Sequence, residues 1–225
     1  MQLVKTSDLC FRYQDDADFI LENINCGINA GDRIGIVGPN GGGKTTLLKL
    51  LGLKIAPSEG SVFVRNEGSI AFLPQDIAGL DSEIGEYGAE FLSGGEKVKF
   101  LLRKIISSEP DVVLLDEPTN HLDIKGIEWL EKFVNRISAA VVMISHDRSI
   151  LNSCVDEIWE VDDGSLTVYR GNYDAYEKFK ADESNRKQKA YSEKKEQIKR
   201  LESAVRDRKN RAEKKIGRAS CRERV

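Results

Sequence analysis

Short apolar runs and amphipathic stretches alternate along most of the chain. Three runs are continuous and rich in β-branched residues, as is typical of strands buried on both faces: 33–37, 112–115 and 140–144. Between them, apolar residues recur at helical spacing in 46–51, 97–106 and 126–137. Strands that alternate with helices predict an α/β fold around a mainly parallel sheet.

Further short runs predict strands outside this parallel sheet. They lie at residues 3–4, 9–13, 19–28, 61–65 and 69–73, with a turn at 66–68 between the last two. Residues 158–161 and 166–169 flank Asp163-Gly164, a dipeptide that favours a tight β-hairpin. The predicted fold class is therefore α/β with an antiparallel β addition, while the polar residues 76–91 predict no regular element.

Residues 173–215 contain no proline or glycine and predict one long, charged helix. Tyr191, Ile198 and Val205 recur every seven residues in it, with Leu201 between the last two. Such a narrow apolar seam suits packing against one partner helix in a coiled coil. The alternative, a lone solvated helix, would need no seam.

The charges are divided unevenly, although the net charge is only −3. Residues 1–177 carry 16 Lys and Arg against 29 Asp and Glu, a balance of −13, and residues 178–215 carry 15 against 7, a balance of +8. A basic arm on an acidic body suggests that the arm contacts a polyanion. The charges could instead only keep the helix in solution, and composition does not decide between these interpretations.

Length and composition are those of a globular protein. A chain of 225 residues, 40% of them hydrophobic, suffices for one large domain or two small ones. No apolar run reaches the roughly 18–20 residues that cross a membrane, and the first residues do not form a signal peptide. The cysteines lack the spacing of a metal or disulfide site, so we expect free thiols and a cytoplasmic location: Cys10, Cys26, Cys154 and Cys221.

The last ten residues, 216–225, do not continue the pattern of the helix before them. Gly217 is expected to break that helix, and no apolar periodicity follows it. The string also matches, letter for letter, a translation of a common sequencing adapter. We interpret it as read-through and not as native sequence. On this interpretation the native protein continues past Lys215, and the chain is an N-terminal fragment.

A glycine-rich motif connects the apolar run 33–37 to the helix after it. Residues 38–45 read Gly-Pro-Asn-Gly-Gly-Gly-Lys-Thr and match Gly-x-x-x-x-Gly-Lys-Thr at every position. The glycines let the backbone approach a phosphate closely, and amide groups at the helix start point at the anion. Lys44 is expected to reach the β- and γ-phosphates, and the Thr45 hydroxyl to hold Mg²⁺. A glycine-rich turn that binds nothing, the alternative, does not explain this context.

Two acidic residues, Asp116 and Glu117, directly follow the run 112–115. They are expected at the edge of the sheet where ligands bind in open α/β folds. Asp116 is expected to hold the magnesium shell, directly or through water, and Glu117 to polarise an attacking water. Upstream, Leu92-Ser93-Gly94-Gly95-Glu96 exposes backbone amides at the start of a helix, where they can form a second anion site.

Together these motifs resemble those of the ATP-binding cassette (ABC) family, over residues 1 to about 175. Residues 38–45 resemble the Walker A loop, 112–117 the Walker B motif with its catalytic glutamate, and 92–96 the ABC signature. The resemblance implies the fold of an ABC nucleotide-binding domain, with ATP and Mg²⁺ as cofactors and ATP hydrolysis as the reaction.

The resemblance also implies roles for single residues. Gln75 is similar to the Q-loop glutamine, Asp123 to the D-loop aspartate, and His146 to the switch histidine that contacts the γ-phosphate. Tyr13 is the best match to the aromatic residue that stacks on adenine, with Phe11 as the second choice. His121 is expected to shape its turn without being a ligand.

By this resemblance the catalytic residues are Glu117, His146 and Gln75, and the magnesium ligands are Thr45, Gln75 and Asp116. The ATP-binding residues are Tyr13, Gly38, Pro39, Asn40, Gly41, Gly42, Gly43, Lys44, Thr45 and Thr46. The signature residues, which would face the ATP of a partner domain, are Leu92, Ser93, Gly94, Gly95 and Glu96.

Two stretches are similar to the ABC-F branch of this family: 116–123 and 169–173, followed by Tyr176. In that branch two ABC domains on one chain are joined by a helical hairpin that reaches toward transfer RNA on the ribosome. The resemblance implies a translation factor or an antibiotic ribosome-protection factor, with residues 1–175 as the ABC domain and 176–215 as the start of the linker. The alternatives are an ABC transporter subunit and a nucleic-acid-binding ABC ATPase.

ABC sites are composite, so the resemblance implies a second ABC domain, in the missing C-terminal half or in a dimer mate. Only 16 residues separate Gln75 from Leu92, where ABC domains usually carry a larger helical subdomain. This shortening is similar to the resistance members of the ABC-F branch and disfavours a transporter subunit, which grips its membrane partner there. A sequence error is the other explanation.

Overall fold

The computed structural model describes residues 1–14, 17–65, 70–77 and 92–222, and only the backbone of residues 201–222. Spatial contacts divide the chain into two units, Met1–Tyr176 and Glu177–Val225. The predicted turn at 66–68 and most of the polar stretch 76–91 lie outside the described residues. The same holds for the side chains of Leu201 and Val205 in the predicted seam.

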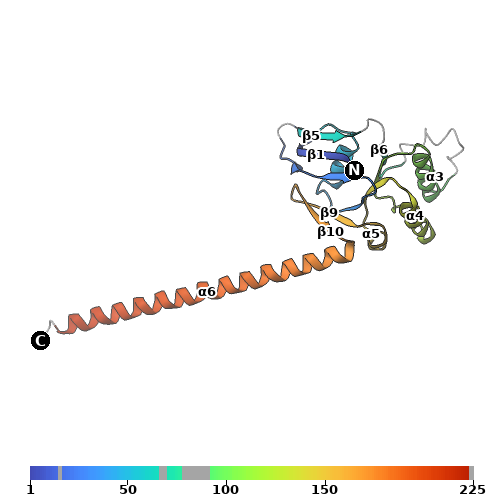
Figure 1. Ribbon diagram of the computed structural model, residues 1–225. Coiled ribbons are helices and arrows are strands. Elements are labelled where there is room, and N and C mark those ends of the chain that lie inside the picture. The colour runs from blue at the N-terminus through green and yellow to red at the C-terminus, as the bar shows by residue number, and fades with distance from the viewer. Residues whose placement is uncertain (15–16, 66–69, 78–91, 223–225) are drawn as a thin grey trace. The chain divides into compact units, whose positions relative to one another are not determined.

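A six-stranded sheet crosses the first unit in the order β10-β9-β4-β8-β7-β6 (Figure 1). Its strands are β4 (Arg33–Val37), β6 (Ile70–Leu73), β7 (Val112–Asp116), β8 (Ala140–Ile144), β9 (Glu157–Asp162) and β10 (Ser165–Arg170). All neighbours are parallel except β9 and β10, which form the predicted hairpin around Asp163-Gly164. The prediction of an α/β fold with an antiparallel addition is confirmed.

A smaller antiparallel sheet is built on β1 (Gln2–Phe11), which pairs with β2 (Leu21–Ile24), β3 (Gly27–Asn29) and β5 (Glu59–Val64). The prediction of separate strands at 3–4 and 9–13 is wrong, since one strand of ten residues covers both. β1 continues through its polar residues because other strands pair with both of its edges. In this part of β1 the Thr6 hydroxyl donates to the Ile24 carbonyl oxygen at 2.9 Å.

The single strand predicted at 19–28 is also wrong, because the backbone divides it into β2 and β3. Within β2, Asn23 has a φ of 52°, in the left-handed region, where the pairing with β1 is irregular. The break follows at Asn25 and Cys26. The Asn25 side chain accepts a hydrogen bond from the Asp8 backbone amide at 2.9 Å. Asparagine tolerates the left-handed region and often bonds to nearby backbone, so this break depends on local polar contacts that an apolar pattern does not reveal.

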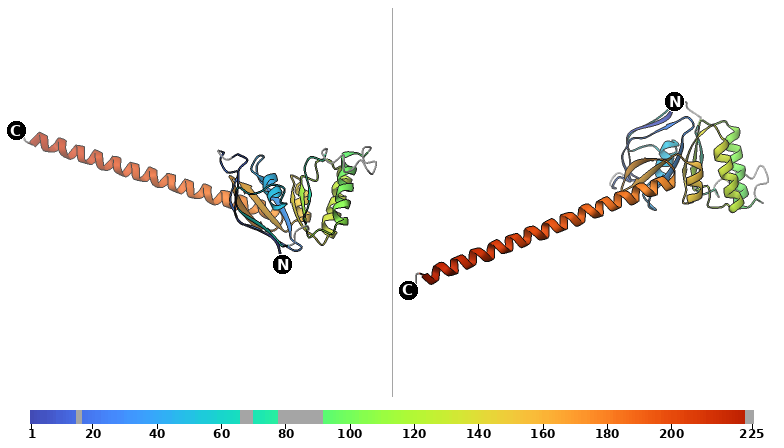
Figure 2. Two further views of the ribbon diagram at one scale, coloured as in Figure 1. Left: turned by 90° about the horizontal axis from the view of Figure 1, so that it is seen from above. Right: turned by 60° about the horizontal axis from the view of Figure 1, so that its bottom comes forward.

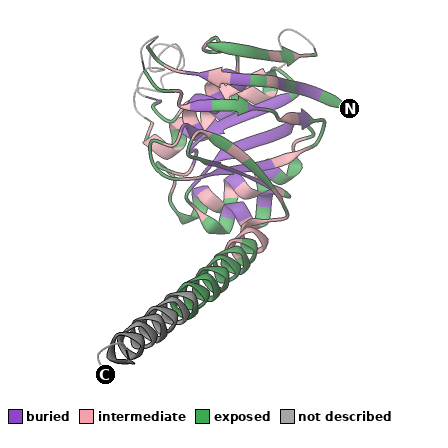
Figure 3. Cartoon of the chain, turned by 90° about the vertical axis from the view of Figure 1, so that its left-hand side faces the viewer, coloured by how far each residue is buried: buried purple, intermediate pink, exposed green. Residues whose placement is uncertain are grey.

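Alternation along the central strands separates two hydrophobic cores. In β7, Val112 and Leu114 belong to the core that contains α1 (Lys44–Leu51) and the antiparallel sheet. Val113 and Leu115 belong to the other core, with α3 (Gly94–Ser107), α4 (Ile124–Arg136) and α5 (Arg148–Cys154). Figure 2 shows α3 and α4 side by side, and Figure 3 shows the buried strands at the centre of this unit. Because both faces are covered, β4, β7 and β8 are apolar except at Arg33, the first residue of β4, and Asp116, the last residue of β7.

Helix α6 (Tyr173–Arg222) confirms the long charged helix, but the expected break at Gly217 is wrong, because the backbone stays helical to Arg222. A glycine inside a helix costs only about 1 kcal/mol relative to alanine, which good helix formers on both sides can offset. Among the described residues, no helix has the length and apolar character needed to cross a membrane.

We expect Leu114→Ala to lower the free energy of unfolding by about 2–5 kcal/mol, because this fully buried side chain would leave a cavity. Chemical denaturation followed by tryptophan fluorescence, to which the buried Trp159 contributes, measures the change. Val168→Ala is the control: Val168 on β10 is 46% exposed, so its effect should stay within about 0.5 kcal/mol. Equal losses in the two variants would contradict this description of the core.

Candidate functional site

A cavity of about 560 Å³ opens where β4, β7 and β8 reach their carboxyl ends. The parallel register places Asp116, the last residue of β7, beside Ile144, the last residue of β8. The cavity is lined by Tyr13, Ile20, Asn40, Gly41, Gly43, Lys44, Thr45, Thr46, Gln75, Asp116, Glu117, Asn120, Ile144 and His146. Most of the residues predicted for nucleotide binding, magnesium and catalysis thus lie around one space.

The loop between β4 and α1 depends on its glycines at two positions in particular. Gly38 has a φ of 147°, and a Cβ atom there would collide with the Val161 carbonyl oxygen of β9. Gly43 has a φ of 96° and caps the start of α1 in the left-handed conformation. Glycine alone adopts such angles without strain, so the loop can stay close to β9 and still turn into the helix.

The Lys44 ammonium is buried at the centre of this loop, with 8% of the residue exposed. It donates to the carbonyl oxygens of Gly38 and Pro39, each at 2.9 Å. Burial lowers the pKa of Lys44, although Glu117 and Asp116 act in the opposite direction. No ion pair joins Lys44 to a carboxylate within the described residues, so its charge is available to an anion in the cavity.

Asp116 and Thr45 meet at the floor of the cavity, where the Thr45 hydroxyl donates to Asp116 Oδ1 at 3.2 Å. Burial raises the pKa of Asp116, and the bond from Thr45 together with Lys49 and Lys44 opposes the rise. Gln75, two residues after β6, lines the same cavity. A hydroxyl, a carboxylate and an amide oxygen are the ligand types that Mg²⁺ accepts beside phosphate oxygens.

Glu117 directly follows Asp116 and has a φ of 50°, an uncommon conformation for a residue with a side chain. Its amide donates to the Ile144 carbonyl oxygen at 3.0 Å, which continues the pairing of β7 with β8. Its Oε1 lies 3.2 Å from His146 Nε2, whereas its Oε2 is buried without a hydrogen-bond partner. Such an orphaned oxygen is costly, and a water molecule in the cavity would satisfy it.

The two candidates for the adenine contact lie in different surroundings. Tyr13 borders the cavity and is 62% exposed, with its hydroxyl 3.0 Å from Thr46 Oγ1. Phe11 belongs to the hydrophobic core and meets the Tyr13 ring edge to face, with ring centroids 4.9 Å apart. A buried ring cannot offer its face to a base, so the geometry favours Tyr13.

The signature-like residues 92–96 and Asp123 do not line the cavity. Ser93 and Glu96 form a capping box at the start of α3: the Ser93 amide donates to Glu96 Oε2 at 2.9 Å. Asp123 caps α4 and accepts from the Gly126 amide at 2.7 Å. His121 also lies outside the cavity, packed against Gly94 and Gly95. The anion site predicted at 92–96 remains a prediction.

Three of the lining residues were not predicted from the sequence: Ile20, Asn120 and Ile144. Ile20 lies beside Gly43, next to the start of β2. Asn120 lies in the turn after Glu117 and donates its amide to the Glu117 carbonyl oxygen at 3.3 Å. Asn120 lies within the stretch 116–123, and that position could have identified it.

The cavity fits a nucleoside triphosphate with magnesium. A buried ammonium without a carboxylate partner suits a phosphate chain, and an orphaned carboxylate oxygen suits a water molecule beside it. The described residues contain no group of three or more His, Cys, Asp or Glu side chains that could hold a metal by itself. Asp116 and Thr45 would therefore share an ion with phosphate and water ligands.

Comparisons with known proteins show the family that this chain resembles. Two family models described as ABC transporter match residues 21–85 and 159–225. The ribosome protection protein VmlR of Bacillus subtilis is 32% identical, over 91% of this chain and 39% of its own length. ABC transporter F family member 4 of Arabidopsis thaliana is 33% identical, over 78% of this chain and 30% of its own length.

The erythromycin resistance ATP-binding protein MsrA of Staphylococcus epidermidis is 35% identical over 65% of this chain. The chain spans 30 to 39% of the length of these three relatives. Among solved structures, cbiO1 from Clostridium perfringens, part of an ABC transporter complex, aligns with a TM-score of 0.64. That match has 23% identity and covers 83% of this chain and 94% of the other, so it supports the fold alone.

We expect Glu117→Gln to stabilise the protein at neutral pH. Burial raises the pKa of Glu117, with Asp116 adding to the rise, although His146 and Lys44 oppose it. A carboxyl whose pKa is higher in the folded state costs stability as pH rises from its unfolded pKa through its folded pKa. The gain from an uncharged glutamine should therefore be complete above the folded pKa and should vanish near pH 4.

Thermal unfolding between about pH 4 and pH 8, followed by fluorescence, measures this gain. The matched control is Glu128→Gln, because Glu128 is exposed on α4. A gain that does not depend on pH, or one that is equal in the control, would contradict the assignment to a buried charge.

Proposed function

Because this chain belongs to the ATP-binding cassette proteins of the ABC-F type, we propose that it is an ATPase whose full-length protein acts on the ribosome. The observation that carries the ATPase assignment is the convergence of Lys44, Asp116, Glu117 and His146 on one cavity at the carboxyl edge of the sheet. These residues have the chemistry that phosphoryl transfer needs, namely positioning and charge neutralisation.

In the proposed reaction Lys44 and the amides of residues 38–46 hold the triphosphate, and Tyr13 stacks on the base. Thr45, Gln75 and Asp116 hold magnesium. Magnesium ATP, when bound, supplies the phosphoryl group and the metal charge that neutralises its oxygens. Glu117 orients water through its unpaired oxygen, and His146 holds the other oxygen of Glu117 in place.

A second ABC domain is proposed to complete the site. Residues 92–96 lie outside the cavity, so they are free to face the nucleotide of another domain. The domain boundaries proposed are 1–175 for the ABC domain and 176–215 for the start of a linker, with 216–225 as non-native read-through.

The ribosome is proposed as the target on two grounds. Two relatives are named for ribosome protection and for erythromycin resistance. Residues 178–215 carry a balance of +8, from 15 basic and 7 acidic residues, which suits contact with ribosomal or transfer RNA.

We expect this chain alone to hydrolyse ATP slowly at low protein concentration, because one Walker loop and one signature cannot close on each other. Phosphate release per chain should increase with protein concentration as two chains meet. Glu117→Gln should lower any measured rate by about 10²–10⁴-fold, as expected for loss of a general base. Fast turnover that does not depend on protein concentration would refute the composite site.

Co-sedimentation with ribosomes tests the proposed target. The full-length protein with Glu117→Gln should pellet with ribosomes when ATP is present, because ATP binds and is not hydrolysed. The same protein with Lys44→Ala should stay in the supernatant, since it lacks the cation for the phosphates. Absence of the Glu117→Gln protein from the pellet would refute the ribosomal role. Salt-sensitive binding to naked duplexes without ATP would favour the nucleic-acid alternative instead.

A further inference from the structure

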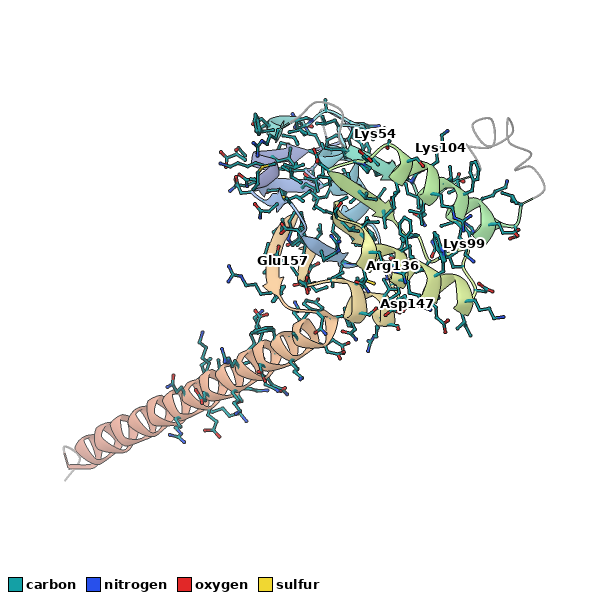
Figure 4. The ribbon with its side chains drawn as sticks, turned by 45° about the vertical axis from the view of Figure 1, so that its right-hand side comes forward. Lys54, Lys99, Lys104, Arg136, Asp147 and Glu157 are labelled. Carbon is teal, nitrogen blue, oxygen red and sulfur yellow. The ribbon has the colours of Figure 1, made fainter. Side chains whose placement is uncertain are left out.

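Helix α5 joins the nucleotide cavity to the first turn of α6. His146 lies just before α5, and Asp147, labelled in Figure 4, caps the helix by accepting from the amides of Ser149 at 2.8 Å and Ile150 at 3.3 Å. Farther along, Asn152 Nδ2 donates to Asp174 Oδ1, and the Asp174 amide donates to Asn152 Oδ1, each at 2.9 Å. We call this reciprocal pair of hydrogen bonds between Asn152 and Asp174 the clasp.

Other contacts of the same turn reinforce the clasp. The Arg148 guanidinium lies 5.3 Å from the centre of the Tyr173 ring, a cation–π contact. Asn172 caps the turn by accepting from the Ala175 amide at 3.2 Å. Helix α5 has only seven residues, so contacts with its neighbours contribute much to its orientation.

The first turn of α6 also reaches the strand that supports the phosphate loop. The buried Glu160 of β9 accepts from the Tyr176 hydroxyl at 2.6 Å and from the Tyr169 hydroxyl at 3.1 Å. Burial, with the bond to Glu160, raises the pKa of Tyr176, so the phenol stays protonated and donates. A second cavity of about 360 Å³ is bordered by Lys44, His146, Glu160, Tyr173 and Tyr176.

The His146 side chain is exposed, so its position depends on the backbone that carries it. Its side chain is 64% exposed, so few neighbours hold the imidazole itself. Its distance of 3.2 Å to Glu117 therefore depends on where the backbone at the start of α5 lies. That backbone is anchored by Ile150 and Leu151 in the core and, on the side of α6, by the clasp.

We propose that Asn152 and Asp174 are positioning residues that hold α5 so that His146 stays against Glu117. Tyr176 supports the same turn of α6 through Glu160. The inference rests on the proposed function only in assigning His146 to the nucleotide. Coupling between two sites is reciprocal, so a nucleotide that moves His146 would also bias the first turn of α6.

Imidazole NMR resonances test the clasp without any nucleotide. The chain has 2 histidines, so a His121→Gln variant assigns both signals and His121 serves as an internal reference. Asn152→Asp sets a second carboxylate against Asp174 and should shift the His146 signal by more than its line width. The His121 signal should not move.

A reversed clasp provides the rescue. In the double variant Asn152→Asp with Asp174→Asn, the new amide can donate to the new carboxylate, and the His146 signal should return to its wild-type position. Asp174→Asn alone keeps an oxygen that accepts from Asn152, so it should leave the signal nearly unchanged. General loss of packing would not be reversed by a second substitution of this kind.

Asn135→Ala is the matched control, because Asn135 donates from α4 to the Ser153 carbonyl oxygen of α5 at 3.4 Å and forms no hydrogen bond with the described residues of α6. Circular dichroism establishes that every variant is folded. An unmoved His146 signal in folded Asn152→Asp, an equal shift in Asn135→Ala, or a double variant that does not recover would each overturn the proposal. Failure of the wild-type chain to bind ATP would refute the proposed function and leave this test intact.

Discussion

Parallel pairing of three buried strands is the constraint on which the rest of this structure depends. β4, β8 and β7 lie side by side, and each ends at the same edge of the sheet. Because parallel strands align their carboxyl ends, the loop after β4, the acidic pair at the end of β7 and the histidine after β8 are brought to one place. A shift of one residue in the register would turn Asp116 into the core and remove the site.

The same constraint produces an electrostatic conflict in the cavity. Asp116 and Glu117 are buried beside each other, and burial raises the pKa of both. Lys44 is buried nearby, and burial lowers its pKa. Each group is thus disfavoured in its charged form by desolvation, and charged ligands would relieve that cost. A site of this kind gives up some stability in exchange for readiness to bind, as functional sites commonly do.

Much of this arrangement could be predicted from the sequence, and particular residues show why. The runs 34–37, 112–115 and 140–144 are apolar at every position, as is typical of strands covered on both faces, and the glycine-rich loop limits what can follow the first of them. The breaks were harder to predict. β1 continues through Thr6-Ser7-Asp8 because strands on both edges pair with it, whereas 19–28 divides at Asn25-Cys26, where the Asn25 side chain bonds to the Asp8 amide. Tertiary pairing and local polar contacts override apolar periodicity at these positions.

The carboxylates of the site and His146 differ in how firmly the fold holds them. The carboxylates of Asp116 and Glu117 are fixed by buried strands, so they cannot move far without disturbing the core. His146, by contrast, has an exposed side chain and lies just before a helix of seven residues. This helix buries Ile150, Leu151 and Cys154 in the core, and polar contacts with the first turn of α6 hold its other side. A ligand that displaces His146 would therefore act on α5, which contacts the first turn of α6 through Asn152 and Arg148.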